Sequence, residues 1–314
     1  MFHKPVLFII FNRPETTMKV FDAISILQPS RLYIASDAPR TGNNEDAKKC
    51  QLARSITENI DWPCEVKRLY QNENLGCSLG PRTAFDWFFS HEEEGIILED
   101  DCIPQPEFFL FAEEMLNRYR DNPKIVSING SNLGFELKNH ESYTCSRYMN
   151  MWGWATWRDR AISIDYELAS WKNIKNPLWF LYSCMRQSLF DFDIHWYKYW
   201  QQKFDWTITK ETITWWDWQW IYHQLKHNQL SIVPSKNLVS NIGFDDNATH
   251  THEKNNPAAN IPTESIIFPL VHPTKLKPNS SYEEHMKWVW CYHKRLPTIF
   301  YVKQFVSSFI RPAK

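Results

Sequence analysis

The chain has 314 residues, of which 23% are charged, and its formal net charge is −1. This near balance of charge argues against a basic surface for nucleic acid. The seven cysteines are scattered without a CxxC pair, which argues against a disulfide framework or a zinc site and fits a reducing compartment.

The first apolar run, residues 6–11, has the continuous hydrophobicity of a strand that is buried on both faces. It is too short for a membrane-spanning helix, which needs about 18 apolar residues, and no later run approaches that length. We therefore expect a cytoplasmic protein. Pro14 suits the first turn of a helix, and apolar residues at helical spacing continue to Leu27.

Strands and helices continue to alternate as far as residue 130. Further strands are predicted over 32–35, 64–70, 95–98 and 125–128, and further helices end near residue 60 or span 81–90 and 108–119. This alternation predicts an α/β fold with a mostly parallel sheet flanked by helices. Ligands bind such sheets at the carboxyl ends of the strands, so residues that directly follow a strand are candidates for a functional site.

Three acids, Glu99, Asp100 and Asp101, directly follow the buried strand at 95–98. Carboxylates this close together repel one another and lose hydration at the edge of the core. Mn²⁺ or Mg²⁺ would relieve that conflict, because hard cations prefer carboxylate and phosphate oxygens. A solvated acidic turn, or an aspartate that caps the next helix, is the alternative. The position at the ligand-binding edge favours the metal site.

The first strand ends in Arg13, and a later strand ends in acids. This order of elements resembles that of the GT-A superfamily of nucleotide-sugar glycosyltransferases. The Glu-Asp-Asp triplet resembles that of N-acetylglucosaminyltransferase I and related bacterial sugar transferases. The resemblance extends from about residue 5 to residue 250. It implies a GT-A-like (Rossmann-like) sheet, with an aromatic-rich second half that binds the acceptor.

The resemblance also implies a role for each residue at the edge of the sheet. Arg13 would lie near the donor nucleotide and its phosphates, and Asp37 would accept a hydrogen bond from uracil if the donor carries UDP. Arg82 would approach the pyrophosphate. Within the triplet, Glu99 would face the donor sugar, Asp100 the ribose, and Asp101 the metal ion.

A second candidate site is the segment 214–220, Thr-Trp-Trp-Asp-Trp-Gln-Trp. The resemblance implies that Asp217 is the general base, although Trp218 replaces a second acid of the family pattern. An inverting transfer needs a carboxylate that takes the proton of the acceptor hydroxyl. Indole faces stack on sugar rings, which makes Trp216 a candidate contact. An aspartate that stabilises a helix N-terminus is the alternative.

Trp152, Gly153 and Trp154 belong to an aromatic segment, residues 148–157. A glycine between two tryptophans indicates a close approach of the backbone, with the rings on either side. We therefore expect a loop that contacts the donor sugar or the acceptor. Packing in the core is the alternative for the rings.

A late segment, residues 241–252, carries Asp245, Asp246, His250 and His252. Many GT-A enzymes complete the metal site with a late histidine, and His250 is our candidate. His252 is the other one, because only one of the two can point inward from an extended chain. The two aspartates could instead hold a second cation, and a solvated loop histidine is the remaining alternative.

From residue 285 onward the chain contains six Lys or Arg residues and no acid, interleaved with aromatic residues. This combination suits the surface of an anionic membrane, so we expect peripheral docking at the inner face, with a terminal helix packed on the sheet as the alternative. We divide the chain into a nucleotide-sugar-binding half at 1–130, an acceptor-binding and catalytic half of the same globule at 131–262, and the tail at 263–314.

The leading hypothesis is a metal-dependent glycosyltransferase. It would move a hexose or N-acetylhexosamine from a nucleoside-diphosphate donor to a hydroxyl of a glycan or lipid-linked glycan. A sugar-phosphate nucleotidyltransferase is the nearest alternative, but it would carry a glycine-rich phosphate loop where this chain has Asn12-Arg13-Pro14. A non-catalytic carbohydrate-binding protein is the other alternative, and it would not need the α/β half.

Overall fold

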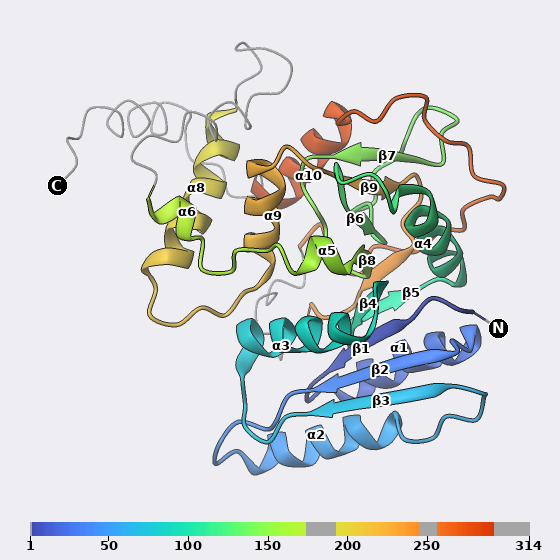
Figure 1. The fold of residues 1–314 in the computed structure, drawn as a ribbon, viewed down its shortest axis with the longest axis vertical. Helices are drawn as coiled ribbons and strands as arrows, with labels where there is room; N and C mark the ends of the chain where they lie inside the picture. The colour runs from blue at the N-terminus through green and yellow to red at the C-terminus, as the bar shows by residue number, and fades with distance from the viewer. Residues whose placement is uncertain (1, 174–192, 245–255, 292–314) are drawn as a thin grey trace.

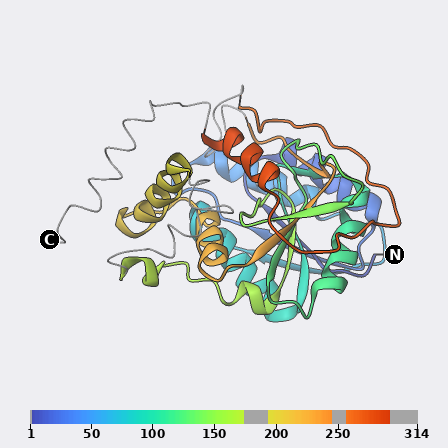
Figure 2. The ribbon, with the colours of Figure 1, turned by 90° about the horizontal axis from the view of Figure 1, so that it is seen from above.

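The computed structural model describes residues 2–173, 193–244 and 256–291. Within these residues an eight-stranded sheet has the strand order β3-β2-β1-β4-β8-β6-β9-β7. Helices lie on both of its faces (Figures 1 and 2). The predicted fold class, an α/β protein with a mostly parallel sheet flanked by helices, is confirmed.

The first half of the chain builds the parallel part of the sheet. Strand β1 pairs in parallel with β2 and β4, and β2 pairs in parallel with β3. The elements follow the predicted alternation: β1 (Val6–Ile10), α1 (Pro14–Leu27), β2 (Arg31–Ser36), α2 (Asn44–Ile56), β3 (Glu65–Tyr70), α3 (Gly76–His91) and β4 (Glu94–Glu99).

The second half extends the same sheet. Strand β8 lies antiparallel between β4 and β6, β9 runs parallel to β6, and β7 forms the antiparallel edge. The elements are β5 (Cys102–Pro104), α4 (Pro106–Tyr119), β6 (Ile125–Asn129), β7 (Tyr143–Ser146), β8 (Trp154–Trp157), α5 (Arg158–Ala161), α6 (Ala169–Lys172), α8 (Ile194–Thr209), α9 (Asp217–Lys226), β9 (Leu230–Pro234), β10 (Val239–Asn241) and α10 (Ser280–Cys291).

Two hydrophobic cores lie on opposite sides of the sheet, because successive side chains of a strand point to opposite faces. Leu7 belongs to the core beneath α3, whereas Val6 and Phe8 belong to the core beneath α1 and α4. Every residue of β4 except the last is buried. Glu99 is therefore the point at which the strand leaves the core.

Strands β7, β8 and β9 lie beyond residue 130, where the alternation predicted from the sequence ends. Residues 154–157 form β8 in the middle of the sheet, not a ligand-binding loop. Tryptophan supports this placement, because large aromatic side chains pack well on a pleated surface.

Several predicted features lie outside the described residues. They are the candidates Asp245, Asp246, His250 and His252, and the basic tail beyond Cys291. In the part of the chain that the structure describes, no helix is long and apolar enough to cross a membrane.

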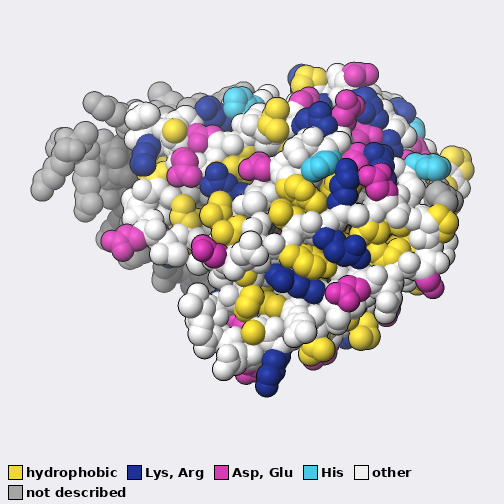
Figure 3. All heavy atoms as spheres, turned by 60° about the horizontal axis from the view of Figure 1, so that its bottom comes forward, with side chains coloured by type: hydrophobic (Ala, Val, Ile, Leu, Met, Phe, Trp, Pro, Cys, Tyr) yellow, Lys and Arg dark blue, Asp and Glu magenta, His cyan; other side chains and the backbone are white. Residues whose placement is uncertain are grey.

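On the face drawn in Figure 3, lysine and arginine side chains are interspersed with acids.

Candidate active site

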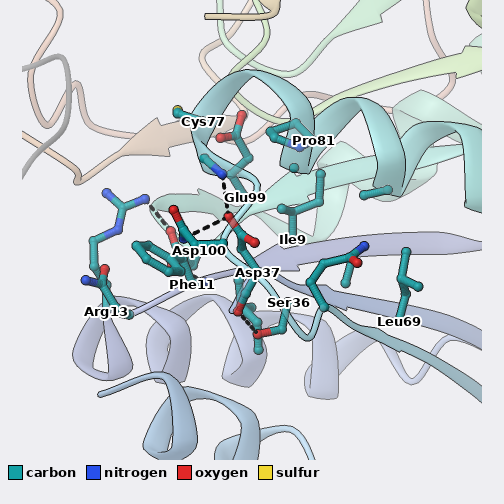
Figure 4. A pocket seen from close by; sticks show the side chains of 18 of the residues that line it. Ile9, Phe11, Arg13, Ser36, Asp37, Leu69, Cys77, Pro81, Glu99 and Asp100 are labelled. Atoms are coloured by element: carbon teal, nitrogen blue, oxygen red, sulfur yellow. Dashed lines mark hydrogen bonds and ion pairs between the residues drawn. The ribbon is translucent and has the colours of Figure 1, made fainter. Parts of the chain in front are cut away.

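A cavity of about 230 Å³ opens at the carboxyl ends of β1, β2, β3 and β4. Its walls come from the ends of these strands and from the first turns of α3. One end carries Arg13 and Asp100, and the other end is apolar, with Leu69 and Ile9 (Figure 4). The cavity thus has a charged end and an apolar end, at the edge where the topology of the sheet predicts a ligand.

Arg13 compensates part of the charge of the acid triplet. Its Nη1 lies 2.9 Å from Oδ2 of Asp101, and its Nη2 is bonded to Oδ1 of Asp100. Asp100 is 2% exposed, and its second oxygen accepts a hydrogen bond from the Phe11 amide at 3.1 Å. The sequence interpretation compensated the charge of the acids with a metal ion alone. In the structure, the guanidinium of Arg13 compensates part of that charge.

Glu99 is the acid of the triplet that lacks such compensation. Within the described residues no hydrogen bond reaches its carboxylate, which lines the cavity. Burial, together with the negative charges of Asp101, Asp100 and Asp217, raises the pKa of Glu99 to about 8 against the opposing charge of Arg13. An unpaired carboxylate among other acids has room for a cation.

The residues at the charged end fit a divalent cation only in part. The described residues contain no group of three or more His, Cys, Asp or Glu side chains that could hold a metal ion. Magnesium-like ions, however, are commonly held by one or two carboxylates together with substrate phosphates. Glu99 and Asp101 are the carboxylates that suit this role. The four acids, which are the triplet and Asp217, carry more negative charge than the single arginine among them can compensate.

Asp37 lines the cavity, and its carboxylate is already engaged. It accepts hydrogen bonds from the amides of Ala38, Leu75 and Gly76 at 2.8–2.9 Å, and from Nδ2 of Asn74 at 3.1 Å. Asp37 therefore holds the start of α3, where a negative charge is favoured by the exposed amides. A carboxylate with four partners has little capacity left for a uracil ring.

Arg82 does not line the cavity. Its guanidinium lies 4.3 Å from the centroid of the Tyr166 ring, and its Nη1 lies 3.3 Å from the exposed carboxylate of Glu167. The helix explains the difference, because Pro81, which precedes it, faces the cavity. Neighbouring positions on a helix point in different directions. Arg82 therefore lies outside the lining of the cavity, and its contact with the pyrophosphate stays a prediction.

The aromatic segment around Gly153 is a packing element. Trp154 is 0% exposed and stacks on Trp216, which is itself 5% exposed. Gly153 has φ +60°, and a Cβ there would lie 2.7 Å from the Val239 side chain. The glycine is needed for this contact within the protein. Trp152 is the partly exposed ring of the set, and it packs edge-on against Phe244 at 5.5 Å.

Asp217 reaches the acid triplet from the second half of the chain. It is the first residue of α9, and its charge raises the pKa of both Glu99 and the Cys77 thiol. Thr214, three residues earlier, lines the cavity. The structure thus brings the two separate sequence candidates, the triplet and Asp217, to one site.

Some residues of the site escaped the sequence interpretation. Gly243 packs directly on Asp101, and the amide of Ile242 donates to the Asp101 carbonyl at 2.8 Å. Arg40 lines the cavity and is bonded to the buried Asp46. The two contacts with Asp101 join positions far apart in the chain, so no local pattern marks them. His250, the predicted metal ligand, lies outside the described residues.

No family model matches the chain, and no curated protein matches it. Three solved structures show a distant likeness. Mouse xyloside xylosyltransferase 1, in its apo form, has a TM-score of 0.34 at 11% identity and covers 74% of this chain and 84% of its own. HddC from Yersinia pseudotuberculosis has a TM-score of 0.30 at 10% identity and covers 50% of this chain and 77% of its own.

The third structure is UDP-glucose pyrophosphorylase complexed with UDP-glucose. Its TM-score is 0.26 at 12% identity, and the match covers 48% of this chain and 64% of that one.

Proposed function

We propose that the protein is a glycosyltransferase that moves a sugar from a nucleoside-diphosphate donor to a glycan hydroxyl, with inversion at the anomeric carbon. One observation carries the proposal. Asp217 of α9 lies near enough to Glu99 for its charge to raise the pKa of that acid. A carboxylate near the triplet, contributed by a separate element, suits a base that acts on an acceptor, while the triplet would receive the donor.

The shape of the cavity supports a nucleotide donor. The base and ribose would occupy the apolar end, near Leu69 and Ile9, and the diphosphate would lie at the charged end, near Arg13. A bound Mn²⁺ or Mg²⁺ would supply positive charge for the departing diphosphate, and Asp101 with Glu99 would hold it. His250 remains a proposed further ligand.

Asp217 would carry the chemical step. Its carboxylate takes the proton of the acceptor hydroxyl as that oxygen forms a bond to the anomeric carbon. The bond between the anomeric carbon and the diphosphate oxygen breaks, and the electron pair leaves with the diphosphate. Attack from the side opposite the leaving group inverts the configuration.

The chain after β1 argues against a sugar-phosphate nucleotidyltransferase. That position holds Asn12-Arg13-Pro14, and the Arg13 side chain is paired with acids. A glycine-rich loop would be expected there to bind the triphosphate of a nucleotide substrate.

The acceptor we propose is a surface polysaccharide or a lipid-linked glycan. The enzyme would be cytoplasmic and would meet this acceptor through its basic tail, docked on the membrane.

The test is to incubate the protein with a panel of nucleotide sugars, with Mn²⁺ or with a chelator, and to measure the released nucleoside diphosphate. We expect release from one donor, and loss of that release in the chelator. Pyrophosphate released from a nucleoside triphosphate and a sugar phosphate would instead identify a nucleotidyltransferase. No release with any donor, alongside tight binding of a glycan, would identify a binding protein.

A further inference from the structure

A cluster of lysine and tryptophan side chains lies where the end of α8 meets the start of α9. We call it the Lys–Trp cluster, and it consists of Lys203, Trp206, Lys210, Trp215 and Trp218. Nζ of Lys203 lies 3.8 Å from the centroid of the Trp218 ring. Nζ of Lys210 lies 4.8 Å from the Trp206 ring and 5.3 Å from the Trp215 ring. Each of the two ammonium groups therefore lies over at least one indole ring.

The cluster has a fixed base and an open rim. Trp215 is 8% exposed, its ring stacks on Trp218 at 4.1 Å, and its Nε1 donates to Oγ1 of Thr207 at 2.8 Å. Trp206, by contrast, is 37% exposed, and Lys210 is exposed beside it. A large aromatic ring and a cation at the surface, held by buried rings beneath them, form a preorganised binding surface.

The Lys–Trp cluster borders the proposed catalytic base. Trp218 directly follows Asp217, and Thr214, which lines the cavity, directly precedes Trp215. Figures 1 and 2 show α8 beside α9, at the end of the molecule away from β2 and β3. A molecule bound on the cluster would therefore lie beside Asp217, the residue that we propose acts on the acceptor.

The chemistry of the cluster favours one class of acceptor. Indole faces stack on the apolar faces of sugar rings, and ammonium groups form strong, charge-assisted hydrogen bonds with carboxylates. The nearby Asp205 accepts a hydrogen bond from Nε1 of Trp171 at 2.9 Å, so its carboxylate is directed to α6. Glu211 is exposed to solvent, which screens its charge.

We propose that the Lys–Trp cluster binds the acceptor and selects glycans that contain carboxylate-bearing sugars. Trp206 supplies the stacking surface, and Lys210 supplies the positive charge at the rim. The assignment to an acceptor rests on the proposed function, whereas the binding of an acidic glycan can be measured without any donor.

The experiment uses two matched probes and isothermal titration calorimetry. One probe is a hexasaccharide of alternating glucuronic acid and N-acetylglucosamine, and the other is the same hexasaccharide with its carboxylates reduced to alcohols. We expect the acidic form to bind about tenfold more tightly, as charge-assisted hydrogen bonds would give. Equal affinity for the two forms would overturn the proposal.

Variants locate the binding on the cluster. Lys210→Gln should remove most of the preference for the acidic form, and Trp206→Ala should weaken both forms by about three- to tenfold. Matched controls are Lys236→Gln, in the loop between β9 and β10, and Trp288→Ala, at an exposed residue of α10. Both should bind like the unmodified protein. Should Trp206→Ala fail to fold, Lys210→Gln still decides the question. Loss of the preference in the controls alone would overturn the proposal.

Further outcomes separate this proposal from a membrane-docking surface and from the proposed function. Binding to vesicles of phosphatidylglycerol, with no binding of the hexasaccharide, would show a membrane surface instead and would overturn it. Release of nucleoside diphosphate by the unmodified protein is measured in parallel. Donor turnover without preference for the acidic probe refutes the cluster assignment alone. Preference without turnover of any donor refutes the proposed function and leaves an acidic-glycan site.

Discussion

Gly243 packs so closely against Asp101 that a Cβ atom on the glycine would lie 2.2 Å from Oδ2 of the aspartate. The contact arises because β10 pairs with β5, which opposes Asn241 to Cys102 and brings the chain after β10 over the triplet. Real Cβ atoms do not approach other atoms this closely, so any side chain at position 243 would require Asp101 to move. This glycine is a positioning residue for Asp101.

Gly243→Ala should displace Asp101 and, with it, Arg13, whose Nη1 would lie 3.0 Å from the new Cβ. We expect metal-dependent turnover to fall by at least about tenfold, as for a small misplacement of a catalytic group. Steady-state kinetics with varied Mn²⁺ measures the effect. The control is Gly80→Ala in the same cavity, where a Cβ would lie at an ordinary 3.5 Å from Asp37. If Gly243→Ala responds to Mn²⁺ as the unmodified protein does, the positioning role is wrong.

Arg13→Ala should lower the free energy of unfolding by about 3 kcal/mol, because it leaves carboxylates at the edge of the core without their cation. Asp100, one of its two partners, is 2% exposed. Denaturant unfolding measures the change. The control is Lys49→Ala, which breaks an exposed pair with Glu45 and should cost less than about 1 kcal/mol. An equal loss in both variants would contradict the compensating role of Arg13.

Asp217→Asn should reduce turnover by at least about a hundredfold, because an amide of the same shape cannot take a proton from the acceptor. Binding of the donor should stay unchanged, since the substitution leaves the donor wall of the cavity intact. Single-turnover kinetics and a donor titration measure the two quantities separately. Glu211→Gln, an exposed acid in the preceding loop, is the matched control. Near-normal turnover of Asp217→Asn would show that another group is the base.

His223 should make the protein less stable as the pH falls from 6.5 toward 4. Burial lowers the pKa of His223 from 6.5 to about 4, with a contribution from His227. The folded state therefore keeps this histidine neutral, while the unfolded state takes up a proton below its own pKa of 6.5. The stabilisation is complete above that pH and is lost as the pH falls toward 4.

His223→Gln removes the titrating group and should flatten this part of the pH profile, by a few kcal/mol at most. Chemical unfolding at a series of pH values between 7 and 4 measures it. His140→Gln, at an exposed histidine, should leave the profile unchanged. A profile for His223→Gln that runs parallel to that of the unmodified protein would refute the prediction.

The sequence alone predicted the parallel part of the sheet and the place of its site. Strands buried on both faces need continuous apolar runs, and β1 and β4 have them, so hydrophobicity located each strand and the acids that follow β4. The same local pattern failed for β8. Its residues are tryptophan, alanine and threonine, and a glycine with a required positive φ precedes it, a combination that also suits a ligand-binding loop.

Only the tertiary structure decided the partners of the site residues. It paired Arg13 with Asp100 and Asp101, turned Asp37 to the start of α3, and directed Arg82 away from the cavity. Hydrogen bonds and ion pairs depend on which strand ends are neighbours and on which face of a helix a residue lies. Residue type and spacing determined that charges would gather at one edge of this sheet. The pairing of β10 with β5 and the packing of α9 determined which groups meet there.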